Sequence, residues 1–174
     1  GISVLTDSEE VYDVVSEFGG NVLMTSEEWP SGTARIASVI NQLNADYVVN
    51  VQGDEPLMTG EIVDDVVFRL EQGDADVVTP VVRITSFEDL VDANINKVVR
   101  ATDGRALYFS HSPIPHVRDE KIQDWLSKTS YWGHVGVYGF RRQVLEEYSQ
   151  LQEGTLEVVE KLEQLRLLEA GKQI

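Results

Sequence analysis

The fold is decided by one stretch, Val48-Val49-Asn50-Val51-Gln52-Gly53-Asp54-Glu55-Pro56-Leu57. A short β-branched run that ends in glycine and acidic residues is typical of a buried strand followed by a turn. Ligands of open α/β sheets bind in the crevice beyond the carboxyl ends of the strands, so we expect Asp54 to stand in such a crevice. Mg²⁺ prefers oxygen ligands and commonly takes only one or two carboxylates, which makes Asp54 a candidate metal ligand. The alternative is an ordinary turn in which Asp54 acts as a cap.

Helical and strand patterns alternate on both sides of this stretch. Three segments repeat the apolar spacing i, i+3, i+4, i+7, which places one apolar stripe on a helix. They are Val11, Val14, Val15 and Phe18; Ile36, Val39, Ile40 and Leu43; and Val63, Val66, Val67 and Leu70. Short apolar runs at residues 2–5, 21–24, 47–51 and 77–82 indicate buried strands. This alternation predicts a three-layer α/β fold, with a mostly parallel central sheet covered by helices on both faces.

The second half of the chain predicts a smaller, mixed β segment. Asp103-Gly104 marks a hairpin turn, and a further strand is expected at residues 131–140. Between them, residues 117–130 are polar and predict a mobile insertion. Two helices are expected at the end of the chain, at residues 141–150 and 156–170. We expect one domain over residues 1–174 that is truncated at both ends, because a strand lies almost at each terminus.

The composition excludes several classes of protein. The chain has 174 residues, with 14 Lys and Arg, 30 Asp and Glu, no Cys and a formal net charge of −16. This excess of negative charge repels a phosphodiester backbone, so we expect no polymeric nucleic acid as a partner. Without thiols, disulfides, iron–sulfur clusters and cysteinyl zinc sites are excluded. The apolar runs are far shorter than the roughly 20 residues of a membrane span, so we expect no membrane partner and a cytoplasmic location.

Two further segments carry candidate binding residues. Ser31-Gly32-Thr33-Ala34-Arg35 opens a helix, whose free N–H groups can face an anion or a polar ring. An ordinary N-cap with a surface arginine is the alternative. His134, Gly136 and Tyr138 share one strand face, where the glycine leaves room for a ligand framed by two polar rings. The alternative there is a strand packed against another backbone.

Acidic residues near the end of the chain form another candidate site. Glu160, Glu163 and Gln164 follow the spacing i, i+3, i+4, so one helix face could offer acceptors to sugar hydroxyls. A solvated acidic face is the commoner meaning of such a pattern. Asp74-Ala75-Asp76 spells the metal-binding triplet of many glycosyltransferases, but it precedes a strand rather than ending one, so we predict a loop. The chain has neither G-x-S-x-G nor a P-loop, which leaves α/β-hydrolases and Walker ATPases unsupported.

Taken together, these segments resemble the CMP-Kdo synthetases, the 3-deoxy-manno-octulosonate cytidylyltransferases. The similarity extends nearly from end to end of the chain. It is carried by Thr6-Asp7, Ser31-Gly32-Thr33 with Arg35, Val49-Asn50-Val51-Gln52-Gly53-Asp54-Glu55-Pro56, Lys97-Val98-Val99, Ala106-Leu107-Tyr108-Phe109-Ser110 with Ile114-Pro115, His134-Val135-Gly136-Val137-Tyr138-Gly139-Phe140-Arg141, and Leu162-Glu163-Gln164-Leu165-Arg166. Each segment alone is a weak signal, whereas so many in order make a strong one.

The resemblance implies a nucleotidyltransferase-like fold and a reaction. The anomeric hydroxyl of Kdo attacks the α-phosphorus of CTP, giving CMP-Kdo for lipopolysaccharide assembly and pyrophosphate. It also implies roles for residues. Asp54 would ligate the catalytic Mg²⁺, Gln52 would lie between nucleotide and sugar as a second catalytic residue, and a homodimer would form through the second half of the chain. The resemblance assigns nucleotide binding to Ser31, Gly32, Thr33 and Gln52. It assigns Kdo binding to His134, Tyr138, Glu163, Gln164 and His111.

This sequence departs from the family pattern at several points. His111 stands where the family usually has an arginine suited to pairing a sugar carboxylate, and Ala34 stands where an acidic residue is expected. The opening loop that grips the triphosphate and the closing segment with a second metal-binding aspartate lie outside this chain. We therefore expect the full-length parent to be an active enzyme and this chain to bind ligand weakly and to turn over poorly or not at all. Three alternatives stay open: a cytidylyltransferase for sialic acid or amino-Kdo, a non-catalytic nucleotide- or sugar-binding module, and a glycosyltransferase that uses Asp74 and Asp76.

Overall fold

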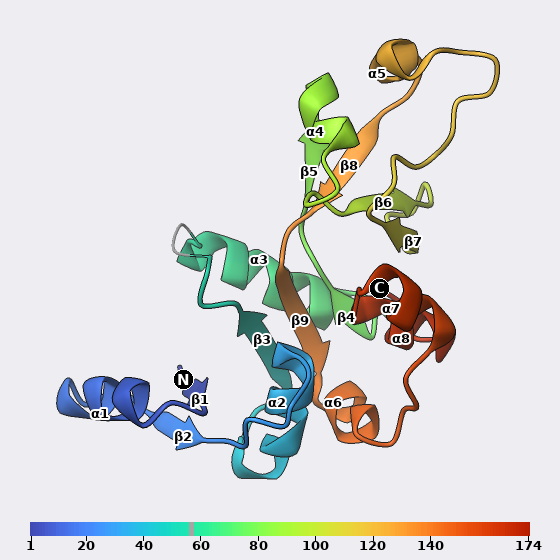
Figure 1. Cartoon of the computed structure of the whole chain (residues 1–174). Helices are drawn as coiled ribbons and strands as arrows, with labels where there is room; N and C mark the ends of the chain where they lie inside the picture. Colours follow the sequence, from blue (N-terminus) through green and yellow to red (C-terminus); the bar gives the residue numbers. More distant parts are fainter. Residues whose placement is uncertain (56–57) are drawn as a thin grey trace.

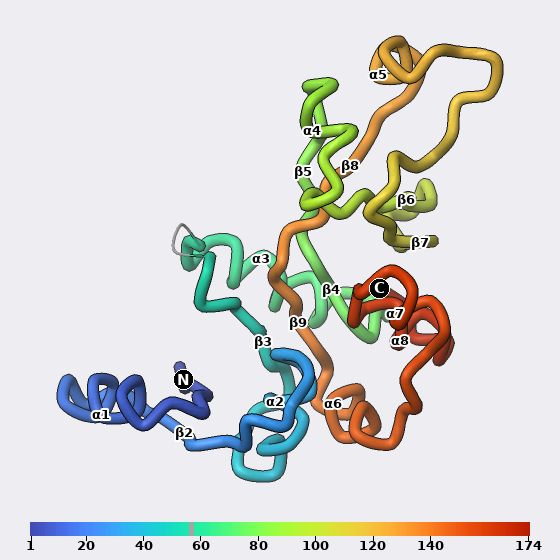
Figure 2. The backbone as a smooth tube through the Cα atoms, in the orientation of Figure 1, coloured from blue at the N-terminus to red at the C-terminus, as the bar shows by residue number. Residues whose placement is uncertain are grey.

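The computed structural model describes residues 1–55 and 58–174. Pro56 and Leu57, the last two residues of the 48–57 segment, lie outside the described residues. Figure 1 shows a lower part that contains the first strands and most helices, and an upper part that is built mainly of strands. The tube in Figure 2 shows how the chain passes from the lower to the upper part and back before it ends beside the middle of the structure.

The first predicted β–α–β unit is confirmed. Strands β1 (Val4–Thr6) and β2 (Val22–Met24) pair in parallel, and α1 (Glu9–Glu17) connects them. Ser8 caps this helix by accepting a hydrogen bond from the Val11 N–H. The predicted apolar stripe of α1 is mostly open to solvent, because only Val15 is buried while the Phe18 side chain is 70% exposed. This helix lies at one end of the structure, away from the main core.

The central sheet was predicted to be mostly parallel, and this prediction is wrong. In this sheet β9 (Val137–Arg141) lies between β3 (Tyr47–Val51) and β4 (Val77–Val78), antiparallel to both. β3 and β4 run parallel to each other, as the predicted crossover through α3 (Gly60–Gln72) requires, but β9 separates them. Their pattern of apolar residues fits either arrangement, since a central strand is buried on both faces whichever way its neighbours run.

A bent two-stranded ribbon joins this sheet to the upper one. One strand of the ribbon is formed by β4 and then β5 (Val81–Ile84), and the other by β8 (Tyr131–His134) and then β9. β4 pairs with β9 in the central sheet, and β5 pairs with β8 in the upper sheet. The ribbon bends at Pro80, whose carbonyl accepts the N–H of Val135 at 3.1 Å. Proline has no N–H to continue the ladder, which explains why the predicted strands at 77–82 and 131–140 are each interrupted.

The upper sheet confirms the predicted hairpin. Its strand order is β5-β8-β6-β7, with β6 (Lys97–Arg100) and β7 (Ala106–Ser110) antiparallel around Gly104, which has a φ of +97°. Helix α4 (Phe87–Val91), η2 (Ile122–Asp124) and α5 (Trp125–Lys128) cover this end. A second apolar cluster of Ile84, Leu90, Trp125 and Tyr131 is buried there. The insertion expected to be mobile is therefore anchored, with Trp125 only 6% exposed.

The main core lies around the central sheet, and further helices close it. These are α2 (Gly32–Ser38) with η1 (Ile40–Gln42), and α6 (Arg142–Tyr148), α7 (Thr155–Glu160) and α8 (Gln164–Glu169) near the C-terminus. Phe140, Val77 and Leu165 are fully buried between them. No helix of the described residues is long and apolar enough to cross a membrane.

The single helix predicted at 156–170 is wrong. Lys161 has a left-handed backbone with a φ of +57°, which ends α7 and lets α8 turn back beside it. Arg166 of α8 then pairs with Glu157 of α7, with nitrogen–oxygen distances of 2.5 and 2.9 Å. Glu160, Glu163 and Gln164 consequently do not share one helix face.

Candidate active site

An open cavity of about 760 Å³ lies where β3, β8, β9 and the α7–α8 turn meet. It gathers seven of the predicted site residues from segments far apart in the sequence. They are Ser31, Gln52, Asp54, His134, Tyr138, Glu163 and Gln164. Other lining residues include Glu55, Asn94, Asn96, Gly136, Glu153, Glu157 and Lys161. The predicted crevice beyond the carboxyl end of the strand at 47–51 is therefore present.

Asp54 lies in the turn after β3 and faces this cavity with its neighbour Glu55. The turn is closed by the Glu55 N–H, which donates to the Gln52 carbonyl at 3.1 Å. Asp54 does not cap the following helix, because the N-cap position of α3 is Thr59. The capping alternative is therefore wrong, and the carboxylate stays available to a ligand.

The start of α2 packs closely against the end of β3. Ser31 is the N-cap and accepts a hydrogen bond from the Ala34 N–H at 3.2 Å. A β-carbon on Gly32 would lie 2.9 Å from the Gln52 Nε2 and 3.1 Å from the Asn50 Nδ2, so the glycine allows this approach. Thr33 is 1% exposed and, like Gly32, is not among the lining residues. Of the four residues predicted to bind the nucleotide, only Ser31 and Gln52 line the cavity.

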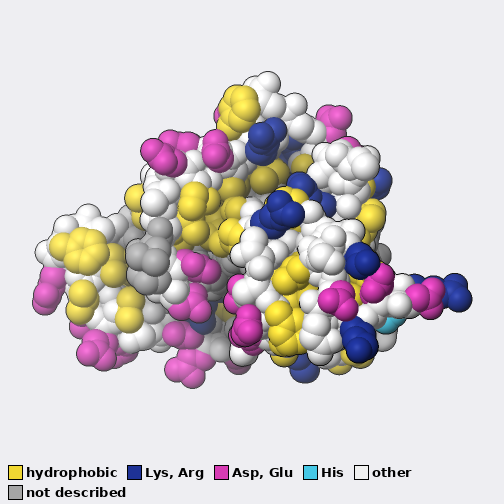
Figure 3. Space-filling model, turned by 90° about the horizontal axis from the view of Figure 1, so that it is seen from above, with side chains coloured by type: hydrophobic (Ala, Val, Ile, Leu, Met, Phe, Trp, Pro, Cys, Tyr) yellow, Lys and Arg dark blue, Asp and Glu magenta, His cyan; other side chains and the backbone are white. Residues whose placement is uncertain are grey.

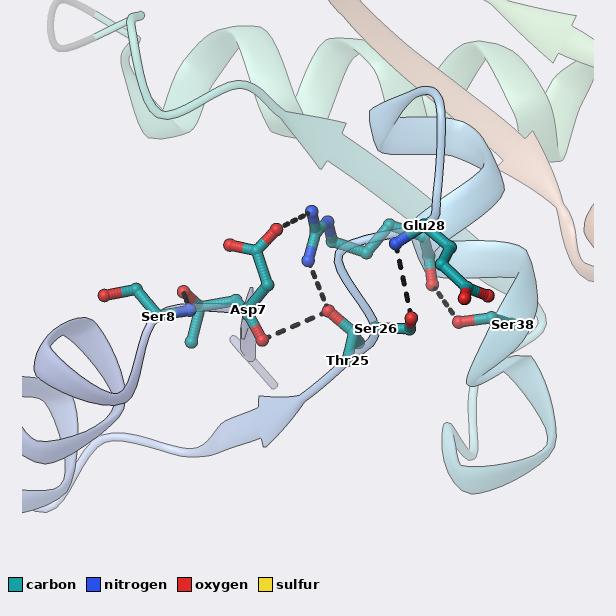
Figure 4. Close-up of polar contacts among 8 residues, drawn as sticks. Asp7, Ser8, Thr25, Ser26, Glu28 and Ser38 are labelled. Carbon is teal, nitrogen blue, oxygen red and sulfur yellow. Dashed lines mark hydrogen bonds and ion pairs between the residues drawn. The ribbon is translucent and has the colours of Figure 1, made fainter.

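Arg35 of the same motif does not point into the cavity. Its guanidinium donates to Asp7 at 2.6 Å and to the Thr25 hydroxyl at 2.5 Å, which ties α2 to the ends of β1 and β2 (Figure 4). The hydrogen bond from Arg35 holds the pKa of the exposed Asp7 carboxyl below its ordinary value. This part of the motif fixes the position of the helix start rather than contacting a ligand.

His134 and Tyr138 form an aromatic wall of the cavity. The His134 ring lies edge-on to Phe109 and tilted against Tyr138, with ring centres 5.4 and 5.0 Å apart. Burial lowers the pKa of His134 to about 4, so the ring is neutral near pH 7. Burial, together with the charge of Glu163, raises the pKa of Tyr138 well above its ordinary value. Both rings therefore act as neutral hydrogen-bonding groups.

Several buried polar atoms have no hydrogen-bonding partner among the described residues, and three of them belong to residues that line the cavity, Asn96, Glu163 and Gln164. The atoms concerned are Asn50 Nδ2, Asn96 Oδ1, Tyr148 OH, Glu163 Oε2 and Gln164 Nε2. Buried polar atoms are nearly always paired, so such a group of donors and acceptors indicates a polar ligand. Asn50, Asn96 and Tyr148 were not predicted, although a lone amide within the apolar run of β3 was a visible signal for Asn50.

The structure places His111 and Glu160 outside the lining residues. The Glu160 carboxylate accepts from the Ser110 hydroxyl at 2.7 Å and from the His111 N–H at 3.1 Å. The His111 Nδ1 lies 2.5 Å from the Ala93 carbonyl oxygen. Glu160 thus holds the end of β7 against α7, and a role for His111 in sugar binding stays a prediction.

The cavity is strongly acidic. Among the described lining residues, Asp54, Glu55, Glu153, Glu157 and Glu163 contribute five carboxylates, whereas Lys161 is the one lysine. The described residues contain no group of three or more His, Asp or Glu side chains arranged to hold a metal ion. Asp54 offers the hard oxygen donor that Mg²⁺ prefers, and this ion commonly completes its shell with water and phosphate oxygens. The residues present therefore fit Mg²⁺ bound jointly with a phosphate ligand.

Asp74 and Asp76 lie elsewhere. Neither lines the cavity, and the Asp76 carboxylate accepts the N–H of Gln173 at 2.8 Å. The predicted loop is confirmed, since both residues precede β4. This placement removes the structural basis for a glycosyltransferase centred on these two aspartates.

Comparisons with known proteins agree with the motifs. A family model described as cytidylyltransferase matches residues 1–174. 3-Deoxy-manno-octulosonate cytidylyltransferase 2 of Actinobacillus pleuropneumoniae is 37% identical over 179 residues, covering 99% of this chain and 71% of that protein. The 3-deoxy-manno-octulosonate cytidylyltransferase of Geotalea daltonii is 41% identical with the same coverage.

Solved structures give the same result for the fold. A CMP:2-keto-3-deoxy-manno-octonic acid synthetase complexed with CTP has a TM-score of 0.90 and 39% identity, covering 99% of this chain and 69% of that one. HddC from Yersinia pseudotuberculosis has a TM-score of 0.53 at 13% identity, covering 84% of this chain and 57% of that one, which shows a shared fold alone. The predicted nucleotidyltransferase-like α/β fold is confirmed, apart from the direction of its strands.

Proposed function

This chain belongs to the cytidylyltransferase family, as its motifs predicted, and from that premise we propose that it couples CTP to Kdo. In this reaction the anomeric hydroxyl oxygen of Kdo attacks the α-phosphorus of CTP. The bond from that phosphorus to the bridging oxygen breaks, pyrophosphate leaves, and the hydroxyl loses its proton. One observation carries the proposal: Asp54, Ser31, Gln52 and His134, which come from segments far apart in the sequence, all line a single cavity.

We place the nucleotide beside the start of α2. Ser31 and Gln52 line the cavity there, and Gly32 lets the helix start lie against the amide groups of β3. The unpaired Asn50 Nδ2 adds a buried donor at the same place. Amide and hydroxyl groups held in fixed positions can pair with the polar edge of a pyrimidine and orient the α-phosphorus for attack.

We further propose that Asp54 holds a Mg²⁺ ion. When bound, the ion would neutralise negative charge on the phosphates of CTP, which is most of what catalysis of phosphoryl transfer requires. The charge of the cavity supports this proposal, because five carboxylates and one lysine would otherwise repel a triphosphate. Asp54 contributes its carboxylate, and Glu55 lies next to it.

The sugar acid is placed against the aromatic wall. His134 and Tyr138 are neutral there. Glu163 and Gln164 each have one buried atom, an acceptor and a donor respectively, that has no partner in the part of the chain that the structure describes. Such a set can pair with several sugar hydroxyls at once.

Pyrophosphate release tests this function. The chain is incubated with CTP and Mg²⁺ and with Kdo, amino-Kdo or sialic acid in parallel, and CMP-sugar formation is followed by mass spectrometry. We expect release with Kdo and at least tenfold less with the other sugar acids. Preference for another sugar acid would make the chain a cytidylyltransferase of different specificity. Calorimetric binding of CTP without release from any sugar would favour a non-catalytic binding module.

We also propose that the chain forms a homodimer through its upper sheet. Val82 and Leu107, on the two edge strands β5 and β7, are 55% and 52% exposed. Figure 3, which views the molecule from above, shows further apolar side chains gathered on that face. Exposed apolar patches of this kind are typical of association surfaces. Sedimentation equilibrium should give twice the 19.5 kDa chain mass, and a Leu107→Asp variant should shift the equilibrium towards the monomer.

A further inference from the structure

Thr79 lies at the bend of the ribbon, between β4 and β5, and its hydroxyl meets three groups. The Thr79 Oγ1 is 2.8 Å from the Nε2 of His134, 2.7 Å from the Val137 carbonyl oxygen and 3.1 Å from the Val135 carbonyl oxygen. Two of these neighbours are carbonyl oxygens, which only accept hydrogen bonds. No local sequence pattern singles out Thr79, and the proposed nucleotide, metal and sugar sites do not include it.

A hydroxyl has a single hydrogen to donate, so the three contacts are not independent. If the Thr79 hydrogen pointed at the His134 Nε2, two carbonyl oxygens would face the hydroxyl oxygen with no hydrogen between them. If the hydrogen points at a carbonyl, the hydroxyl oxygen is free to accept a hydrogen bond from the imidazole. The second arrangement satisfies the 2.7 Å contact to Val137, which is a normal length for a hydroxyl donor.

We propose that Thr79 fixes His134 in the tautomer that carries its proton on Nε2, so that Nδ1 faces the cavity as an acceptor for a sugar hydroxyl. Thr79 is then a positioning residue, because it acts through His134. This inference rests on the proposed function for the identity of the ligand, but the tautomer itself does not depend on it.

The surroundings of the imidazole support this assignment. Phe109 and Tyr138 pack against the ring and offer no charge that would favour the doubly protonated form. Within the described part of the chain, the His134 Nδ1 has no hydrogen-bonding partner. It is not among the buried polar atoms that lack a partner, and His134 lines the cavity, so this nitrogen is accessible from the cavity. The ionisable groups that share the cavity with it are Asp54, Glu55, Tyr138, Glu153, Glu157, Lys161 and Glu163.

A chemical preference follows from the tautomer. A neutral imidazole with a free Nδ1 can accept a hydrogen bond from a hydroxyl, but it cannot donate one to the carboxylate of a sugar acid. His134 would therefore select for a hydroxyl at the matching position of the substrate, and a deoxy analogue at that position would bind more weakly. The carboxylate of the sugar must be bound by another group.

Nitrogen-15 spectroscopy of the ligand-free chain tests the tautomer directly. Long-range proton–nitrogen spectra near pH 7, assigned by comparison with His134→Gln, should show the His134 proton on Nε2. Thr79→Ser keeps the hydroxyl and should keep this pattern, whereas Thr79→Val removes it and should shift the His134 signals towards a mixture of tautomers. A wild-type spectrum with the proton on Nδ1, or on both nitrogens, would overturn the proposal whether or not Thr79→Val folds.

Kinetics separate this proposal from the function on which it rests. With Kdo and CTP, Thr79→Val should raise the KM for Kdo about five- to tenfold and leave the KM for CTP unchanged, while Thr79→Ser stays close to wild type. Equal changes in the KM for Kdo and the KM for CTP would contradict the proposal that Thr79 acts through His134. If no sugar acid supports pyrophosphate release, the proposed function fails, but the spectra still decide the tautomer.

Discussion

Gly139 of β9 lies so close to Val66 of α3 that a β-carbon on the glycine would come within 2.3 Å of the Val66 Cγ1. The same β-carbon would lie 2.9 Å from the Leu70 Cδ1. The helix therefore packs directly on the backbone of the strand that separates β3 from β4. The same strand pairs with β3, with Tyr138 opposite Asn50, so the carboxyl end of β3 that leads to Asp54 lies beside the strand on which the helix packs.

We predict that Gly139→Ala lowers the free energy of unfolding by about 1–3 kcal/mol, because α3 must move to admit the methyl group. Urea denaturation followed by circular dichroism measures this change. Gly60→Ala is the matched control, since a β-carbon there meets nothing within 4 Å and Gly60 begins α3. Equal stability of wild type and Gly139→Ala would show that the helix is not seated on the strand.

The buried ammonium group of Lys97 holds a loop that lines the cavity. The Lys97 side chain is fully buried, and its Nζ donates to the carbonyl oxygens of Asp92, Ile95 and His111 at 2.5, 2.8 and 3.0 Å. Burial lowers the pKa of this lysine. We predict that Lys97→Met costs about 1–3 kcal/mol of unfolding free energy, because buried carbonyl groups lose their donor.

Thermal and urea unfolding of Lys97→Met measure this cost, with the exposed Lys121→Met as the control for loss of a lysine charge. The variant should also weaken ligand binding, because Asn94 and Asn96 line the cavity from the loop that Lys97 holds. A Lys97→Met chain as stable as Lys121→Met would contradict a structural role for the buried ammonium group.

His134 predicts a pH dependence of stability. Burial lowers its pKa to about 4 in the folded chain, against an ordinary value of 6.5. Between these values the unfolded chain binds a proton that the folded chain does not, so the free energy of unfolding falls as the pH drops from 6.5 to 4. The loss amounts to at most about 3 kcal/mol. Above pH 6.5 both states are neutral at this residue and its contribution is constant.

Urea denaturation of wild type and His134→Gln at about pH 7 and pH 4.5 isolates this effect. The substitution removes the titrating group, so the variant should lose less stability than wild type over the same interval. Parallel losses in the two proteins would mean that the buried imidazole binds its proton equally well in the folded and unfolded chains.

The sequence predicted those features that depend on local pattern. The strand at 47–51, the turn that carries Asp54 and the N-cap at Ser31 are all present, because strand, turn and cap preferences act within a few residues. His134, Gly136 and Tyr138 all line the cavity, but the single strand predicted to carry them is wrong, because His134 ends β8, Tyr138 belongs to β9 and Gly136 lies between the two strands. Their glycine neighbour Gly139 faces the opposite way and provides the helix contact.

The features that were missed depend on partners far apart in the sequence. The position of β9 between β3 and β4 follows from pairing Val49 with Gly139, which no local period encodes. The break at Lys161 is also set by tertiary contacts, since Arg166 and Glu157 pair only when the chain reverses there. The Thr79 contact with His134 arises from the bend of the ribbon, which brings together residues 55 positions apart, so no local pattern indicates it.

The central claim is that Asp54 binds a divalent ion together with CTP, and calorimetric titration of CTP with and without Mg²⁺ tests it most directly. Asp54→Asn and Asp74→Asn each remove one exposed carboxylate, from inside and outside the cavity respectively. We predict that Mg²⁺ strengthens CTP binding at least tenfold in wild type and Asp74→Asn, and that Asp54→Asn loses this gain. Retention of the full Mg²⁺ effect by Asp54→Asn would contradict the account.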